Sequence, residues 1–136
     1  MPRFDLDDIL RNLEPIVGDI DYVFCTLAEA GYGDYGHLEP FAAISEHESL
    51  TLIVPESKAH AAGLSYDCIY KMITLNVFSS LESVGLTAVV SAALADKGIS
   101  ANMVAGFHHD HLFVPSDRAA DAVEILDRLW DKNSTK

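Results

Sequence analysis

Four segments of the chain are predicted to be helical, three from apolar residues at helical spacing and one from Pro55 at a first turn with Gly63 as the stop. In the segment ahead of Pro15 they lie near one face, with carboxylates on the opposite face, and the helix should end at Pro15 or Gly18. Gly98 follows the third segment, and a glycine there can take the left-handed conformation that ends a helix. The predicted helices cover residues 4–13, 55–62, 84–97 and a stretch that begins near Ser116.

Shorter apolar runs, rich in β-branched and aromatic residues, separate these helices and predict strands. The run at 66–78 is long for one strand and is expected to bend or to change partner midway. The glycine-rich and proline-containing segment 29–40 predicts a loop. The predicted strands cover 21–27, 41–44, 50–54, 66–78, 99–107 and 112–114.

A short repeat relates the two halves of the chain. Residues 54–59 (VPESKA) match residues 114–119 (VPSDRA), and both copies follow an apolar strand, a polar turn and a second apolar strand. With the same offset, Ala43-Ile44 falls on Met103-Val104. The pattern indicates a duplicated unit of strand, turn, strand, proline and helix.

The order of elements in the second half, strand-helix-strand-strand-helix, is most of a βαββαβ ferredoxin-like arrangement. The predicted fold class is α/β (α+β), with tandem ferredoxin-like units, antiparallel or mixed sheets and helices on one face. We expect a degenerate N-terminal unit over 1–67 and a C-terminal unit of this arrangement over 68–136. The first half lacks an equivalent of the 84–97 helix, so the 4–13 helix is expected to take that place on the first sheet. The crossover through 84–97 predicts parallel strands on either side of it.

No strand follows the last predicted helix, which leaves the second sheet with an open edge. An open edge favours pairing with another chain, so we expect a homodimer.

The formal net charge of −12 bears on the partners. Nucleic acid and anionic membrane surfaces are expected to be repelled. No apolar run is long enough to span a bilayer, and the acidic start does not resemble a secretion signal, so a cytoplasmic location is predicted. Cys25 and Cys68 lie in apolar runs without metal-ligand spacing, and are expected to be buried thiols in a reducing compartment.

Three segments of the second half together resemble an ACT domain: 81–87 (LESVGLT), 94–103 (LADKGISANM) and 109–115 (HDHLFVP). More narrowly, the whole chain resembles small bacterial tandem-ACT proteins. The resemblance implies a non-catalytic regulatory or sensor protein that binds a small amino acid or similar zwitterion and needs no cofactor. It also implies a site between the helix-start loop of one unit and the sheet edge of another.

The glycine turn before the 84–97 helix has a chemistry that agrees with such a ligand. Gly85 lets a ligand approach the backbone closely, and the free amides at a helix N-terminus favour a carboxylate. The side-chain oxygen of Asn102 would accept a hydrogen bond from the ligand's ammonium. No catalytic residue is predicted, and the predicted ligand-binding residues are Ser83, Val84, Gly85, Leu86, Thr87 and Asn102.

The histidine-rich turn His108–His111 leaves an alternative open. Alternate residues of a hairpin share a face, so His109 and His111 would reach one metal ion, in a small ferredoxin-like enzyme or metal-binding protein. The competing interpretation, which we favour, is a polar turn that binds no metal.

Overall fold

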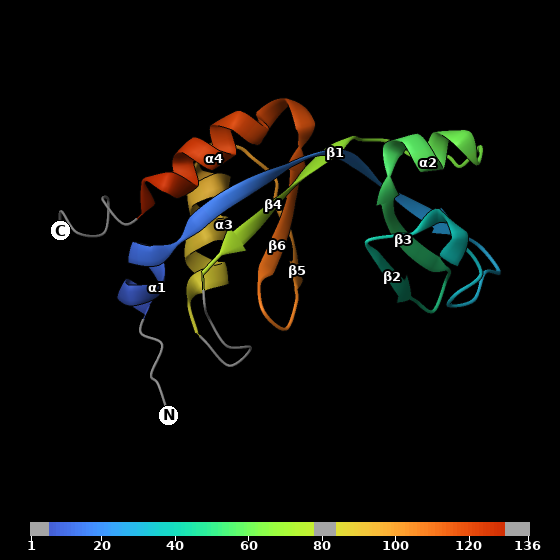
Figure 1. The fold of residues 1–136 in the computed structure, drawn as a ribbon, viewed down its shortest axis with the longest axis horizontal. Helices are drawn as coiled ribbons and strands as arrows, with labels where there is room; N and C mark the ends of the chain where they lie inside the picture. The colour runs from blue at the N-terminus through green and yellow to red at the C-terminus, as the bar shows by residue number, and fades with distance from the viewer. Residues whose placement is uncertain (1–5, 78–83, 130–136) are drawn as a thin grey trace. The chain divides into compact units, whose positions relative to one another are not determined.

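The computed structural model describes residues 6–77 and 84–129, and the chain divides into two compact units (Figure 1). The larger unit combines two stretches that are distant in sequence, Met1–Gly18 and Lys71–Lys136. The smaller unit is the intervening segment Asp19–Tyr70. None of the helices that the structure describes is long and apolar enough to cross a membrane.

The larger unit is an α/β sandwich of a sheet and two packed helices. Its sheet has the order β1-β4-β6-β5, and β5 pairs with β6 antiparallel, with Asn102 opposite Phe113. The helices α3 and α4 pack together and contribute to one hydrophobic core with β4 and β6 (Figure 1). Its elements are α1 (Leu6–Asn12), the first residues of β1 (Glu14–Leu27), β4 (Tyr70–Asn76), α3 (Leu86–Asp96), β5 (Asn102–Ala105), β6 (Asp110–Pro115), the 3-10 turn η2 (Ser116–Arg118) and α4 (Ala119–Asp127).

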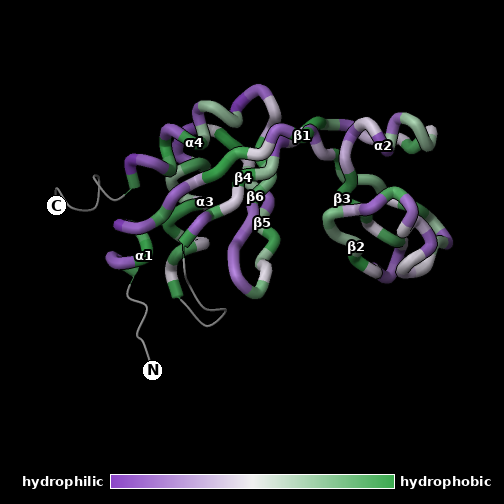
Figure 2. The backbone as a smooth tube through the Cα atoms, in the orientation of Figure 1, coloured by the Kyte–Doolittle hydropathy of each residue, from purple (hydrophilic) through white to green (hydrophobic). Residues whose placement is uncertain are grey.

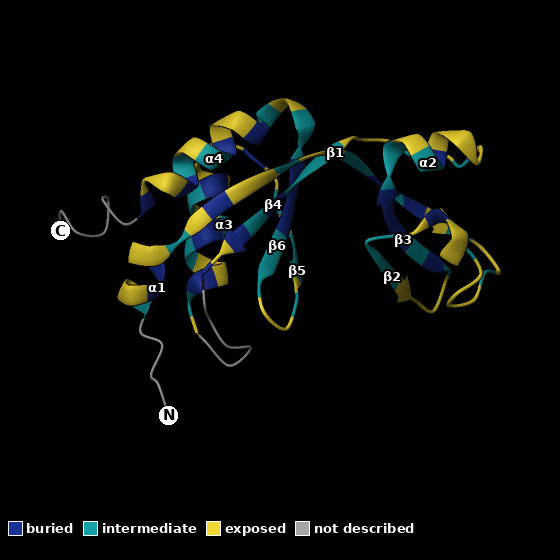
Figure 3. Ribbon diagram, viewed as in Figure 1, coloured by how far each residue is buried: buried dark blue, intermediate teal, exposed yellow. Residues whose placement is uncertain are grey.

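The core of this unit is built by apolar residues that alternate along the strands and recur at helical spacing along the helices. Ile73 and Leu75 alternate along β4, and Leu112 and Val114 do the same along β6, so each pair points to one face of the sheet. Hydrophobic residues recur along the strands and along α3 (Figure 2), and the buried stripe of the helices covers that face (Figure 3). The fully buried helix residues are Val90 and Leu94 of α3 and Ala122 and Leu126 of α4.

The N-terminal helix belongs to the larger unit, so its expected place on the first sheet is wrong. Ile9 and Leu10 of α1 are each 3% exposed and join the core built by β4, β6, α3 and α4. The physical reason is covalent: one residue separates α1 from β1, so the helix stays with the unit that the start of β1 joins.

The first strand begins at Glu14, seven residues earlier than predicted. Asn76 Nδ2 donates to Glu14 Oε1 at 3.1 Å, and a Cβ added at Gly18 would lie 3.7 Å from the carbonyl oxygen of Met72. These two contacts place the start of β1 antiparallel to β4, as the outermost strand of the larger sheet. Pro15 is compatible with this position because an edge strand does not need every amide for pairing.

The start of β1 therefore supplies the fourth strand that the second half lacks. The edge along β4, which we expected to be open, is covered by residues 14–18 of the same chain. The argument for a homodimer from this edge does not hold, and the dimer stays a prediction. The strands joined through α3 are β4 and β5, and β6 lies between them; their parallel orientation stays a prediction.

The smaller unit contains a three-stranded arrangement in the order β2-β3-β1, with both pairs antiparallel. Loop residues and the 3-10 turn η1 stand where a first ferredoxin helix would be, as the sequence predicted, and Leu38 of this turn is buried. Cys25 is buried, and desolvation raises the pKa of its thiol, whereas Cys68 is exposed, against expectation. Its elements are the remainder of β1, η1 (Gly36–Leu38), β2 (Ala42–Ser45), β3 (Leu50–Pro55) and α2 (Glu56–Ala61).

The repeat seen in the sequence is also present in the backbone. Pro55 and Pro115 each end a strand and precede a helical turn, with φ, ψ of −55°, 135° and −52°, 135°. Ile53 and Phe113, at the matching positions two residues earlier, are both completely buried. Fixing φ by proline at this point sets the same exit from the strand in both units.

Candidate ligand-binding site

The first turn of α3 begins at a glycine, which has no side chain to cap the helix. Gly85 occupies the N-cap position with φ +103°. The Gly85 carbonyl accepts the first helical hydrogen bond, from the amide of Val89 at 2.9 Å. The amides at the start of a helix lack intrahelical acceptors, so this turn presents donors and the positive end of the helix dipole.

One side of Gly85 is occupied by the N-terminal helix. A Cβ built on Gly85 would lie 3.1 Å from Cδ2 of Leu6 and 3.7 Å from its Cδ1. Glycine is thus required here both by the positive φ and by the packing of α1. Leu6 therefore occupies the side of Gly85 toward which a Cβ would point.

The other predicted residues lie at two different ends of α3. Val84 is 87% exposed and Thr87 is exposed, while Leu86 is 3% exposed, so its side chain belongs to the core. Ser83 lies outside the described residues. Asn102 is exposed at the start of the edge strand β5, shortly after the C-terminal end of α3.

The length of α3 separates Gly85 from Asn102 within one chain. A helix of 11 residues, Leu86–Asp96, is about 16 Å long at 1.5 Å per residue. The chain turns directly after it, because the Ile99 amide donates to the Leu94 carbonyl at 3.0 Å. A small ligand that contacts both the amide turn and Asn102 would therefore take them from two different copies.

The histidine turn is a tight hairpin with the bend at 106–109. The Gly106 amide donates to the His109 carbonyl at 2.9 Å, and a Cβ on Gly106 would approach that oxygen to 2.8 Å, so glycine is needed there. His111 Nδ1 lies 2.9 Å from Thr74 Oγ1, whereas the buried Nδ1 of His109 has no hydrogen-bond partner among the residues that the structure describes. The described residues contain no group of three or more histidine, cysteine or acidic side chains that could hold a metal ion.

Burial makes His111 sensitive to pH. Desolvation, and secondarily the neighbouring His109, lower the pKa of His111, which Asp110 only partly offsets. The folded state therefore binds fewer protons than the unfolded state as the pH falls below the ordinary histidine pKa of about 6.5. Stability should fall in that range, toward the lowered pKa.

We expect His111→Asn to reduce this pH dependence of the unfolding free energy. Asparagine keeps a short polar group near Thr74 but does not titrate. His47→Asn, at an exposed histidine, is the matched control and should leave the dependence as in the parent. Urea unfolding at a series of pH values between 4.5 and 7.5 measures the slope; an equal slope in the parent and His111→Asn would contradict the assignment.

Comparison with known protein families agrees with this fold. Two ACT-domain models match the chain in tandem, one over residues 3–71 and the other over 67–128. The chain belongs to the ACT-domain family, as a small tandem-ACT protein. The domain boundary between residues 67 and 68 stays a prediction. The compact units follow a different division, because residues 1–18 belong to the same unit as residues 71–136.

Solved structures include similar proteins of comparable length. A Vibrio cholerae protein of unknown function, described as a possible transport protein, is 42% identical, with 92% of this chain and 95% of that chain covered and a TM-score of 0.84. An Agrobacterium tumefaciens protein is 15% identical over 87% and 89% of the two chains, with a TM-score of 0.73. The regulatory subunit of aspartate kinase from Thermus flavus shares the fold at 9% identity, 86% and 97% coverage and a TM-score of 0.64. A search of curated proteins gave no match.

Proposed function

We propose that this protein is a non-catalytic, cytoplasmic regulator or sensor that binds a small amino acid or similar zwitterion. Its family supports a regulatory role that depends on a small ligand. The observation that carries the proposal is the first turn of α3, which begins at Gly85 with positive φ, and where backbone donors and the helix dipole favour a carboxylate. The proposed contacts are Ser83, Val84, Gly85, Leu86 and Thr87 for the carboxylate, and Asn102 for the ammonium.

The separation of Gly85 and Asn102 supports a homodimer as the binding form. The ligand would bridge the amide turn of one copy and the start of β5 in its partner. Binding would then favour one arrangement of the two copies over another, which is a shift in population. This would give a signal to a regulated protein without any chemistry in the ligand site.

A thermal-shift screen of the full chain against the twenty amino acids tests the proposal. We expect one or a few amino acids to stabilise the fold by several degrees, because ligand at 100 times its Kd contributes about 2.7 kcal/mol. Asn102→Ala should abolish the shift, while Asn12→Ala, at an exposed asparagine of α1, should retain it. Substitution of Gly85 is a poor test because it also strains the fold.

Two results would count against the proposal. One is the absence of a shift with any amino acid at millimolar concentration. The other is a shift that Asn102→Ala leaves unchanged. Light scattering in the presence of the stabilising amino acid should report a dimer, and a monomer under those conditions would exclude the two-copy site.

The metal alternative is tested in the same assay. The unpartnered Nδ1 of His109, next to His111, is the observation in its favour. Stabilisation by zinc or nickel that is lost in the double variant His109→Ala, His111→Ala would support it. With only two candidate ligands in the described hairpin, we expect no such stabilisation.

A further inference from the structure

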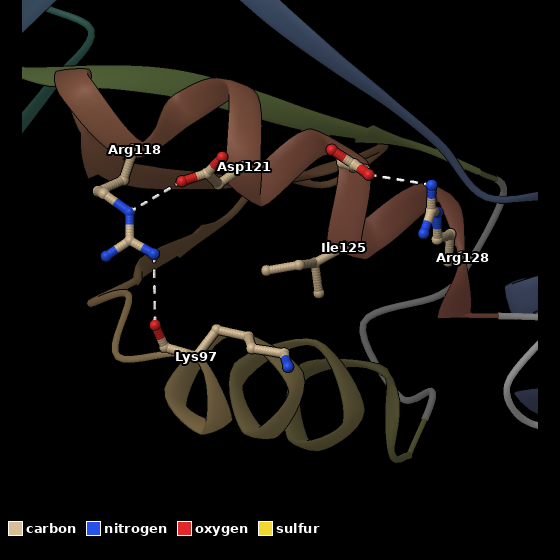
Figure 4. A pocket seen from close by; sticks show the side chains of 6 residues that line it. Lys97, Arg118, Asp121, Ile125 and Arg128 are labelled. Atoms are coloured by element: carbon tan, nitrogen blue, oxygen red, sulfur yellow. Dashed lines mark hydrogen bonds and ion pairs between the residues drawn. The ribbon is translucent and has the colours of Figure 1, made fainter.

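A groove between the end of α3 and the outer face of α4 has no role in the site described above (Figure 4). Its volume is about 360 Å³, and it lies entirely within the larger unit. We call it the α3–α4 groove. Its lining residues are Lys97, Arg118, Asp121, Glu124, Ile125 and Arg128.

The two guanidinium groups of the groove are held in place by acidic side chains of α4 and by the backbone at the end of α3. Arg118 Nε donates to Asp121 Oδ2 at 3.1 Å, and its terminal nitrogen donates to the Lys97 carbonyl at 3.3 Å (Figure 4). Arg128 pairs with Glu124 at 2.9 Å. A guanidinium has five N–H donors, and these contacts use only some of them, so oriented donors remain.

The groove has one cation more than it has anions. Two arginines face two carboxylates, and the ammonium of Lys97 makes no ion pair with any residue in the described part of the chain. This is a local excess of positive charge on a chain whose net charge is −12. It favours an anion over a neutral molecule.

The groove also has an apolar part, which favours a ligand with an apolar group beside its charge. Ile125 is partly buried against the core and lies between the charged side chains (Figure 4). We propose that the α3–α4 groove binds a small monocarboxylate with a short aliphatic body. The carboxylate would contact Lys97 and the remaining donors of Arg128, and the body would cover Ile125.

This inference does not depend on the proposed amino-acid site. Lys97 lies at the C-cap of α3, at the end opposite Gly85, and Ile125 lies on α4, which carries no residue of the proposed amino-acid site. A ligand in the groove therefore changes the surroundings of a different set of amides from a ligand at the first turn.

An amide NMR titration of the full chain with isovalerate tests the inference, with isoamyl alcohol as the uncharged probe of the same shape. We expect saturable shifts at Lys97 and Ile125 with isovalerate and none with the alcohol. Lys97→Met should weaken binding about tenfold or more, since a hydrogen bond to a charged group is lost. Arg128→Gln should weaken it as well.

Lys58→Met makes the same change of net charge in the smaller unit and should leave the affinity unchanged. The inference is overturned if isovalerate gives no saturable shift, if the alcohol binds equally well, or if both lysine variants weaken binding alike. Shifts confined to Thr87 and its neighbours would overturn it too, and would leave the amino-acid site intact.

Discussion

Replacing Ile9 by aspartate should unfold the larger unit far more readily than any change on the exposed face of α1. The side chain of Ile9 is 3% exposed within the core that residues 71–129 build, although it lies more than 60 residues earlier in the sequence. Truncating a buried isoleucine costs about 2–5 kcal/mol, and burying a carboxylate adds to that cost, so we expect a loss on the order of 4 kcal/mol or more.

Amide hydrogen exchange measures this loss separately for the two units. Ile73 and Leu75 report on the larger unit, and Leu52 and Val54 give a reference in the smaller unit. In Ile9→Asp the amides of Ile73 and Leu75 should lose protection by a factor that corresponds to the lost stability, while those of Leu52 and Val54 serve as the reference. Unchanged protection at Ile73 and Leu75 would show that α1 is not part of this core.

Asn12→Asp is the control for the added charge. It introduces a carboxylate into the same helix, at an exposed position where Asn12 Nδ2 donates to the Asp8 carbonyl at 2.8 Å. Losing that bond and placing an anion at the helix C-terminus should cost about 1 kcal/mol at most. The contrast between the two variants isolates burial from charge.

Local periodicity was enough to predict most helices and strands. The hairpin of β2 and β3, the helix α3 ahead of Gly98 and the proline exits at Pro55 and Pro115 all follow from patterns within about ten residues. Each pattern acts through its own turn or its own pair of strands, so the sequence nearby contains the necessary information.

The partner of the N-terminal segment could not be predicted in the same way. The apolar face of α1 would satisfy either sheet, and nothing in residues 6–12 specifies which one. Pro15 and Gly18 also suggested a break where β1 in fact continues, because the strand is outermost in the larger sheet and tolerates both residues. Tertiary pairing therefore decides this part of the fold.

The candidate site was predictable only in part, for a related reason. The turn of Gly85 is visible in the sequence because a positive φ at a helix start favours glycine. The closure of one side of this turn by Leu6 is a contact between segments 79 residues apart (85 − 6), and so is invisible locally. The α3–α4 groove has no motif at all, because its residues are ordinary surface charges until the two helices pack.

Gly85→Ala should destabilise the protein more than Gly98→Ala, although both replace a glycine that flanks α3 at positive φ. Gly98 has φ +72° and no atom within 4 Å of an added Cβ, so only backbone strain of about 1 kcal/mol is expected there. Gly85 has φ +103°, and its added Cβ would also press on Leu6 at 3.1 Å. We expect a loss of about 2 kcal/mol for Gly85→Ala.

A double-mutant cycle with Leu6→Ala separates the two costs at Gly85. Removing the leucine side chain destabilises the protein by itself, but it also removes the atoms that an added Cβ would meet. Urea unfolding of the four proteins should therefore show a favourable coupling of about 1 kcal/mol between Leu6→Ala and Gly85→Ala. The same cycle with Gly98→Ala should show none. If Gly85→Ala costs the same with and without the Leu6 side chain, the glycine is needed for its backbone conformation alone, and the contact with Leu6 does not contribute.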